Sequence, residues 1–163
     1  SLWLEREPTR EEVLADIERQ NPDNFDEIVF CGYGEPTCRL HDMLWICRQI
    51  RSRWNILIRL NTNGHASLLY GEDTTPLFAG LFDVVSISLN AADAHTYDKI
   101  CHSIYKEEAY YGLLKFARDI KKYVPCVILT VVEGMISDED IKKCARTAEE
   151  LGVKLRVRSY IDS

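Results

Sequence analysis

The stretch IVFCGYGEPT, residues 28–37, decides how the rest of the chain is interpreted. Three apolar residues typical of a buried strand lead into two glycines, a glutamate and a proline. A plain turn needs one glycine, so a pair of glycines beside an acidic residue indicates a strand end shaped to hold a ligand. A tight strand-to-helix turn is the other interpretation. A dinucleotide-binding fingerprint does not fit, because Thr37 stands where its third glycine would be.

Strands and helices alternate around this stretch. Apolar periodicity and capping signals predict strands at residues 27–31, 55–60, 82–89, 125–132 and 154–160, and helices after Thr9, around Thr75 and at residues 41–53, 94–101, 106–123 and 138–151. Helices between successive strands imply parallel pairing with right-handed crossovers. The predicted fold class is therefore α/β, with a parallel sheet of about five strands in one domain over residues 1–163. A leading helix without a preceding strand predicts a further strand upstream of Ser1.

Two details of packing are also predicted. Residues 28–30 and 84–85 are continuous apolar runs, which predicts strands that are buried on both faces. Ser137 caps the last helix and Gly152 ends it. The apolar stripe of that helix consists of Ile141, Cys144, Ala145, Ala148 and Leu151.

Polar residues collect where the predicted strands end. In chain order they are Gly32, Gly34, Glu35; Asn61, Thr62, Asn63, Gly64; Ser86, Ser88, Asn90; Thr130, Glu133; and Arg156, Arg158, Tyr160. The carboxyl ends of parallel strands meet at one edge of the sheet, where α/β proteins bind ligands. Period-two spacing predicts that Ser86, Ser88 and Asn90 share one face. Taken singly, each group has a plainer explanation as a turn, a pair of mutually bonded serines, or a solvated edge strand. Together they predict a polar mouth for a polar small molecule.

Composition limits the classes of function. The chain has 163 residues, 46% of them hydrophobic, and a net charge of −6. No basic run stands out, which disfavours a dedicated nucleic-acid surface. No apolar run approaches the roughly 20 residues of a membrane span, and the charged start SLWLEREPTREE does not look like a signal peptide. We therefore expect a cytoplasmic protein with no membrane contact.

The six cysteines could form disulfides or remain reduced thiols, and we expect them to be reduced. Cys47 and Cys144 fall on apolar helix faces, as small buried hydrophobic residues do. Cys38 and His41 have the spacing of half a zinc site, but no second half is visible. Adjacent residues on a helix point apart, which disfavours Cys101 and its neighbour histidine as a nucleophile–base pair. The sequence therefore predicts no metal ligands in this chain.

In order, these features resemble the radical S-adenosylmethionine (SAM) superfamily, in which a partial (βα) barrel binds SAM and a [4Fe-4S] cluster. Gly32-Tyr33-Gly34-Glu35-Pro36 resembles the family's glycine–glutamate motif, which binds the amino group of the methionine moiety. In this comparison the strand predicted upstream of Ser1 is the first strand of the barrel. The chain is most similar to radical SAM proteins linked to TatD-type hydrolases in the runs LWLE, VFCGYGEPT, IRLNTNG, VSISLNA, KKYVP and AEELGVKLRVRSYI.

The resemblance implies roles for individual residues. The methionine moiety would contact Gly32, Tyr33, Gly34, Glu35 and Pro36. Arg158 would bind a carboxylate or a phosphate. The rest of the ligand, including its ribose, would contact Asn61, Asn63, Ser86, Ser88 and Asn90. The implied activity is reductive cleavage of SAM followed by hydrogen abstraction from an unknown substrate. The implied partners are SAM, that substrate, a reductant such as flavodoxin or ferredoxin, and a TatD-type hydrolase.

One departure from the family is large. The cluster is held by a Cys-x3-Cys-x2-Cys loop, and no such spacing occurs among the six cysteines. We expect the loop upstream of Ser1, so the chain as given would not assemble the cluster. The alternative is a barrel without a cluster that acts as a non-catalytic module for SAM, a nucleotide or a TatD-type partner. A phosphosugar barrel enzyme is disfavoured, because no glycine-rich turn beyond Gly134 follows a late strand.

Overall fold

The computed structural model describes residues 7–31 and 35–160, and its framework is one five-stranded sheet. The strands run in the order β1-β2-β3-β4-β5, and every neighbouring pair is parallel. Their bounds are β1 Glu27–Phe30, β2 Leu57–Thr62, β3 Val84–Ser88, β4 Cys126–Val132 and β5 Lys154–Arg158. The predicted α/β class and parallel sheet are therefore confirmed.

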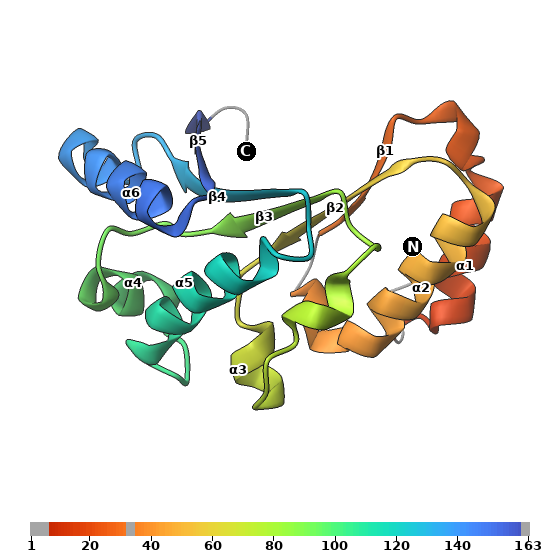
Figure 1. Ribbon diagram of the computed structural model, residues 1–163, viewed down its shortest axis with the longest axis horizontal. Helices are drawn as coiled ribbons and strands as arrows, with labels where there is room; N and C mark the ends of the chain where they lie inside the picture. The colour runs from red at the N-terminus through yellow and green to blue at the C-terminus, as the bar shows by residue number, and fades with distance from the viewer. Residues whose placement is uncertain (1–6, 32–34, 161–163) are drawn as a thin grey trace.

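The helices lie on one side of this sheet and at its two ends (Figure 1). They are α1 Arg10–Arg19, α2 Leu40–Arg53, α3 Ala66–Tyr70, α4 Ala94–Cys101, α5 Glu108–Ile120 and α6 Asp138–Leu151, with short 3-10 turns η1 Pro22–Asn24, η2 Pro36–Arg39 and η3 Thr75–Phe78. Figure 1 places α3, α4 and α5 below the sheet, α1 and α2 beyond β1, and α6 beside β4 and β5. The upper face carries no helix among the described residues, so the sheet is a partial barrel with an open inner face.

Alternation along the strands explains why one face is covered and the other is open. Ile58, Leu60 and Ile87 have no exposed side-chain surface and pack against the helices. The residues between them, such as Arg59 and Ser86, point to the opposite face. An apolar side chain stabilises by about 1.5–3 kcal/mol when it is buried, so the apolar half of each strand fixes which face the helices cover. The inner face is left to polar residues.

The predicted helix ends are confirmed where side chains cap the backbone. The Thr9 hydroxyl accepts from the Glu12 amide, and the Glu12 carboxylate accepts from the Thr9 amide, which completes a capping box. Ser137 accepts from the Asp140 amide at the start of α6. Gly152 ends that helix in the left-handed region, with φ +73°.

Four expectations about local structure need correction. Val29 is 39% exposed because it lies on the open inner face and lines a hollow there, so β1 is not buried on both faces. Ala145 is exposed on α6, because the helix buries only the narrower stripe around Cys144. The predicted helix around Thr75 is the 3-10 turn η3. Helix α3 was not predicted, since the turn NTNG before it gave no helix-start signal.

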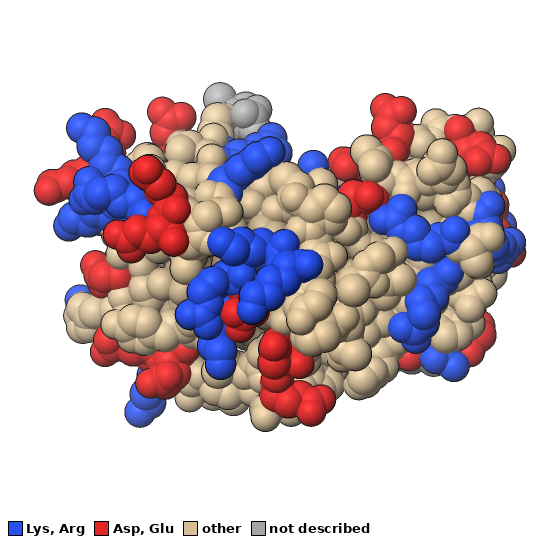
Figure 2. All heavy atoms as spheres, viewed as in Figure 1, with Lys and Arg blue, Asp and Glu red and all other residues tan. Residues whose placement is uncertain are grey.

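Charges of both signs are mixed on the face seen in Figure 2. Lys and Arg side chains gather over α5, with acidic side chains beside them. This mixture gives no broad field of one sign on that face. Within the described ranges, no helix combines the length and the apolar character needed to cross a bilayer.

Candidate functional site

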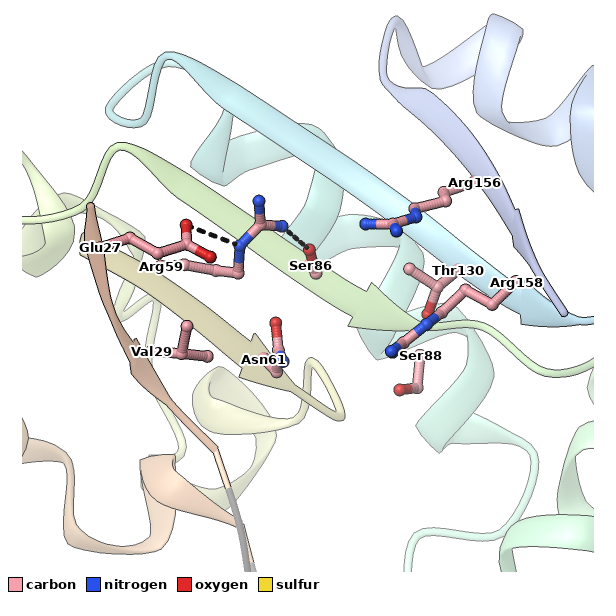
Figure 3. A pocket seen from close by; sticks show the side chains of 9 residues that line it. All are labelled: Glu27, Val29, Arg59, Asn61, Ser86, Ser88, Thr130, Arg156 and Arg158. Atoms are coloured by element: carbon pink, nitrogen blue, oxygen red, sulfur yellow. Dashed lines mark hydrogen bonds and ion pairs between the residues drawn. The ribbon is translucent and has the colours of Figure 1, made fainter. Parts of the chain in front are cut away.

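A hollow of about 230 Å³ lies on the open inner face of the sheet (Figure 3). All five strands contribute to its lining, which consists of Glu27, Val29, Arg59, Asn61, Ser86, Ser88, Thr130, Arg156 and Arg158. Its volume is below the roughly 300–1,000 Å³ of typical small-molecule pockets, so it fits one end of a ligand or a small substrate. Six residues of the predicted polar mouth line it, namely Asn61, Ser86, Ser88, Thr130, Arg156 and Arg158.

The lining residues form two rows that differ in their distance from the carboxyl edge of the sheet. The floor row, farther from that edge, consists of Glu27, Arg59, Ser86 and Arg156. The rim row, two residues later on each strand, consists of Val29, Asn61, Ser88 and Arg158. Thr130 of β4 pairs in register with Ser88 of the rim row on one side and Arg156 of the floor row on the other, and it lies between them in Figure 3. The hollow thus has a charged floor and a largely uncharged rim.

Arg59 is held in place by two partners in the floor row. Its Nη1 donates to Ser86 Oγ at 3.2 Å, and its Nε lies 3.5 Å from Glu27 Oε2. The Arg59 side chain is 23% exposed, so water screens these contacts less than on an open surface. The guanidinium group therefore has a fixed orientation over β2 and β3.

Glu35 joins the ends of β1 and β2. Its Oε2 accepts from the Thr37 amide at 2.9 Å, the Thr37 hydroxyl at 2.5 Å and the Thr62 hydroxyl at 2.7 Å. Its Oε1 accepts from the Asn63 amide at 2.6 Å. A carboxylate has about four acceptor sites, two per oxygen, so Oε1 keeps one for a ligand. The main contribution of Glu35 in this structure is to hold two strand ends together.

Two further polar contacts, made by Asn63 and His65, hold the turn after β2. The Asn63 side-chain oxygen accepts from the His65 amide at 3.0 Å. The His65 ring nitrogen Nε2 lies 2.8 Å from the Tyr97 hydroxyl of α4. Both rings are buried, and burial raises the pKa of the Tyr97 hydroxyl. Together with Glu35, this pair determines where residues 61–64 lie.

Acid is expected to destabilise the fold through His65. Burial lowers the pKa of His65 from its usual 6.5, and the neighbouring Glu35 carboxylate only partly opposes this. Below pH 6.5 the unfolded chain binds a proton that the folded chain does not, so the free energy of unfolding falls with pH until the folded-state pKa is reached. Urea titrations between pH 7.5 and pH 5 measure this slope. His65→Gln should flatten it and the exposed control His95→Gln should not; an equal slope in all three proteins would contradict the assignment.

The structure places the predicted ligand residues in three groups. Gly32, Tyr33 and Gly34 lie outside the described residues. Asn61, Ser86, Ser88 and Arg158 line the hollow, as their strand positions predict. Glu35 and Pro36 begin the turn beside the end of β2, where Asn63 also lies.

Asn90 does not share the face of the two serines. Strand β3 ends at Ser88, and Asn90 has a left-handed backbone with φ +62°. Period-two alternation applies only while the backbone is extended, so the predicted shared face ends at Ser88. Asn90 is exposed and does not line the hollow.

Sequence reasoning missed several residues of this region. Glu27 and Arg59 lie within strands that looked apolar, and only their alternation with buried neighbours could have placed them on the inner face. Thr62 was noted as a turn residue, but its bond to Glu35 spans 27 positions in sequence. His65 and Tyr97 gave no local signal, because they meet only after two helices pack.

Another hollow, of about 340 Å³, lies outside the sheet between α3 and α5. Two of its three acidic side chains, those of Asp73 and Asp119, have local partners, and the third is that of Glu72. Asp73 accepts from the Thr75 amide and hydroxyl, and Asp119 pairs with Arg118 at 3.2 Å. None of its lining residues belongs to a strand, so the inner-face hollow, which all five strands line, is the better candidate.

The residues of this chain do not fit an iron–sulfur cluster. Four cysteine thiolates hold such a cluster in most proteins, or three where a ligand takes the last iron. Cys47 and Cys144 are buried in the core, where burial raises their thiol pKa values to about 12 and about 11. Within residues 7–31 and 35–160, no three Cys, His, Asp or Glu side chains converge on a metal position.

Comparisons with known proteins identify the family. The radical SAM superfamily model matches residues 2–148. No curated protein sequence matched the chain. Three solved structures are similar: a radical SAM methyltransferase from Sphaerobacter thermophilus (19% identity, TM-score 0.71, 96% of this chain and 48% of that one), Streptococcus suis SuiB bound to precursor peptide SuiA (19%, 0.71, 95% and 33%), and TYW1 with a lysine-pyruvate adduct bound (20%, 0.64, 93% and 53%).

At these identities the three structures support the fold alone, and the chain spans about half of their length or less. The family model, in contrast, covers most of the chain and includes the segment around Glu35. This chain belongs to the radical SAM superfamily.

Proposed function

We propose that this domain binds SAM between the rim row and the Glu35 turn, as part of a radical SAM enzyme. The proposal rests on the Glu35 clamp, by which we mean the four hydrogen bonds that the Glu35 carboxylate accepts from Thr37, Thr62 and Asn63. This clamp lies beside the polar inner face of the sheet. It joins the strand end that resembles the glycine–glutamate motif to the turn at residues 61–64. Ligand sites of open α/β sheets lie at this edge.

The residues of the domain would bind and orient the ligand. Its methionine ammonium would donate hydrogen bonds to the remaining acceptor site of Glu35 Oε1 and, as the resemblance to the family motif implies, to backbone carbonyls of residues 32–34. Asn61 and Ser88 of the rim row offer amide and hydroxyl groups for the ribose. Arg158 at the end of β5 would meet a carboxylate or a phosphate. Asn63 would act mainly through the backbone position that Glu35 fixes.

In this family SAM, when bound and reduced, supplies a 5′-deoxyadenosyl radical that abstracts a hydrogen atom from the substrate. The described residues hold no ligand set for a cluster, so the electron has to reach SAM from outside this domain. We place the cluster loop in a longer chain and the electron donor in a partner such as flavodoxin or ferredoxin. Six free cysteines support a reducing compartment such as the cytoplasm.

The test uses the full-length gene product, purified without oxygen. Its iron content, its visible absorbance and its affinity for SAM are measured first, and SAM with a reductant is then added to detect 5′-deoxyadenosine. Bound iron, SAM binding and 5′-deoxyadenosine are the expected results. A protein that binds iron but neither binds nor cleaves SAM would contradict the proposal.

The lack of a Cys-x3-Cys-x2-Cys spacing favours one alternative, a binding module without a cluster. Such a module would bind SAM or a nucleotide with no iron and no 5′-deoxyadenosine. A link to a TatD-type hydrolase rests on sequence resemblance alone, since the three solved structures named above carry no such description. Co-purification of the full-length protein with a TatD-type hydrolase tests that link separately.

A further inference from the structure

The floor of the hollow has an excess of positive charge that SAM does not explain. Arg59 and Arg156 line the floor together with one carboxylate, that of Glu27, which leaves a net positive charge there. Figure 3 shows the guanidinium groups of Arg59 and Arg156 directed toward the middle of the sheet from opposite sides. The sulfonium and ammonium groups of SAM are cations that nearby cationic side chains disfavour, and its one carboxylate is already assigned to Arg158 of the rim row. The floor is therefore suited to a different, anionic group.

We propose that the floor row is an anion-binding subsite that holds a phosphate or carboxylate group of the substrate. The proposal rests on the proposed function, because it assigns the floor to the substrate of the same reaction for which the rim row holds SAM.

Arg59 provides a preorganised donor for such an anion. Glu27 and Ser86 occupy its Nε and Nη1 at 3.5 Å and 3.2 Å, which leaves its Nη2 free of any bond to the other floor-row residues. An arginine whose orientation is already fixed loses less side-chain entropy on binding a ligand. The 23% exposure of its side chain also limits competition from water.

Ser86 adds a neutral donor at the same place. Its Oγ accepts from Arg59, so the hydroxyl hydrogen is available for an oxyanion. Ser86 is only 8% exposed, and a buried hydroxyl that donates to a ligand gains the bond that it otherwise lacks. Hydroxyl and guanidinium donors side by side match two oxygens of one phosphate or carboxylate group.

Arg156 closes the floor from the opposite side. Among the described residues its guanidinium group has no ion pair or hydrogen bond, and the residue is exposed. Its register partner Thr130 stands next to it on β4 and carries no charge. When an exposed arginine without a carboxylate partner binds an anion, it loses contacts with water, and no existing ion pair has to be broken. Substrate binding would thus order Arg156, whereas Arg59 is ordered beforehand.

The hollow is large enough for the anionic group of a substrate but too small for a whole substrate. About 230 Å³ on the inner face accommodates an oxyanion with a few carbon atoms. The remainder of the substrate would extend past the rim row toward the carboxyl edge of the sheet. An anchored anion would hold the substrate in a fixed position relative to SAM, which is how binding energy supports the orientation of reacting atoms.

The test is anion binding by the full-length protein, with inorganic phosphate and malonate as probes in calorimetric titrations. Arg156→Gln removes one floor donor without touching the Glu27–Arg59–Ser86 contacts, and Arg146→Gln is a matched control on the exposed face of α6. We expect the loss of Arg156 to weaken the better probe at least tenfold and the control to leave it unchanged. A preference for phosphate identifies a phosphoryl group on the substrate, and a preference for malonate identifies a carboxylate.

SAM affinity, measured on the same proteins, separates this proposal from the proposed function. Binding of neither probe, or equal weakening in Arg146→Gln, would overturn the subsite. Competition between SAM and the probe, with parallel loss of both in Arg156→Gln, would also overturn it, because the arginine would then serve SAM. A protein that binds the probes but not SAM would contradict only the proposed function.

Discussion

Replacement of Glu35 by glutamine is expected to weaken SAM binding by the full-length protein about 100-fold, which corresponds to about 2.7 kcal/mol. The Glu35 carboxylate accepts four hydrogen bonds from Thr37, Thr62 and Asn63, and each bond to a charged group contributes about 1.5–3 kcal/mol. The glutamine amide would turn a donor toward one of these donors. We therefore expect the ends of β1 and β2 to separate and the ligand edge to lose its shape.

Two further variants test whether the loss of SAM affinity in Glu35→Gln results from the loss of the hydrogen bonds of Glu35. Thr62→Val removes one donor and should weaken SAM binding by a smaller factor, since three of the four bonds are kept. Glu149→Gln neutralises an exposed carboxylate on α6 and should leave SAM affinity unchanged. Equilibrium binding to the three variants and the parent gives the comparison. Unchanged SAM affinity in Glu35→Gln would show that the clamp does not support the site.

Replacement of Gly64 by alanine is expected to reduce the free energy of unfolding by about 2–5 kcal/mol. Gly64 has φ +81°, a left-handed conformation that costs other residues about 1–2 kcal/mol. A Cβ at this position would also lie 2.9 Å from Cγ2 of Ile87 and 3.1 Å from Cγ of Leu113, both in the core. Overpacking of this kind adds about 1–3 kcal/mol.

Gly71 is a matched control for this substitution. It has a similar φ of +70°, but a Cβ there would meet no atom within 4 Å. Gly71→Ala should therefore cost only the backbone term, about 1 kcal/mol. Urea unfolding followed by tryptophan fluorescence measures both variants. Equal losses would mean that the contacts with Ile87 and Leu113 relax without cost.

The sheet could be predicted from sequence because its signals are local. Alternating side chains, capping residues such as Thr9 and Ser137, and the stop at Gly152 each act within a few positions of the chain. The bounds of the strands shifted by at most two residues, because strand ends depend on pairing with neighbours and not on propensity. The exposure of Val29 followed from the absence of a covering helix on the inner face among the described residues, which local sequence does not encode.

The candidate site could be predicted only in part, for a related reason. Asn61, Ser88 and Arg158 were placed correctly, because strand ends in a parallel sheet converge on one edge. The bonds that fix this edge join distant segments: Thr62 to Glu35, and His65 to Tyr97. Such pairs have no sequence spacing of their own, so they follow only from the assembled fold. The assignment of Glu35 to a ligand also remains a prediction that SAM binding has to test.

The strand order bears on how the protein forms during synthesis. Each strand pairs only with the strands made immediately before and after it, and no later segment has to insert between earlier ones. A nascent chain can therefore add one helix–strand unit at a time to an edge that already exists, in the order in which it leaves the ribosome. Slow long-range pairing, which delays many β-rich proteins, is kept to a minimum. We expect translation pauses between these units to be tolerated, since every partial sheet already presents the edge that the next strand needs.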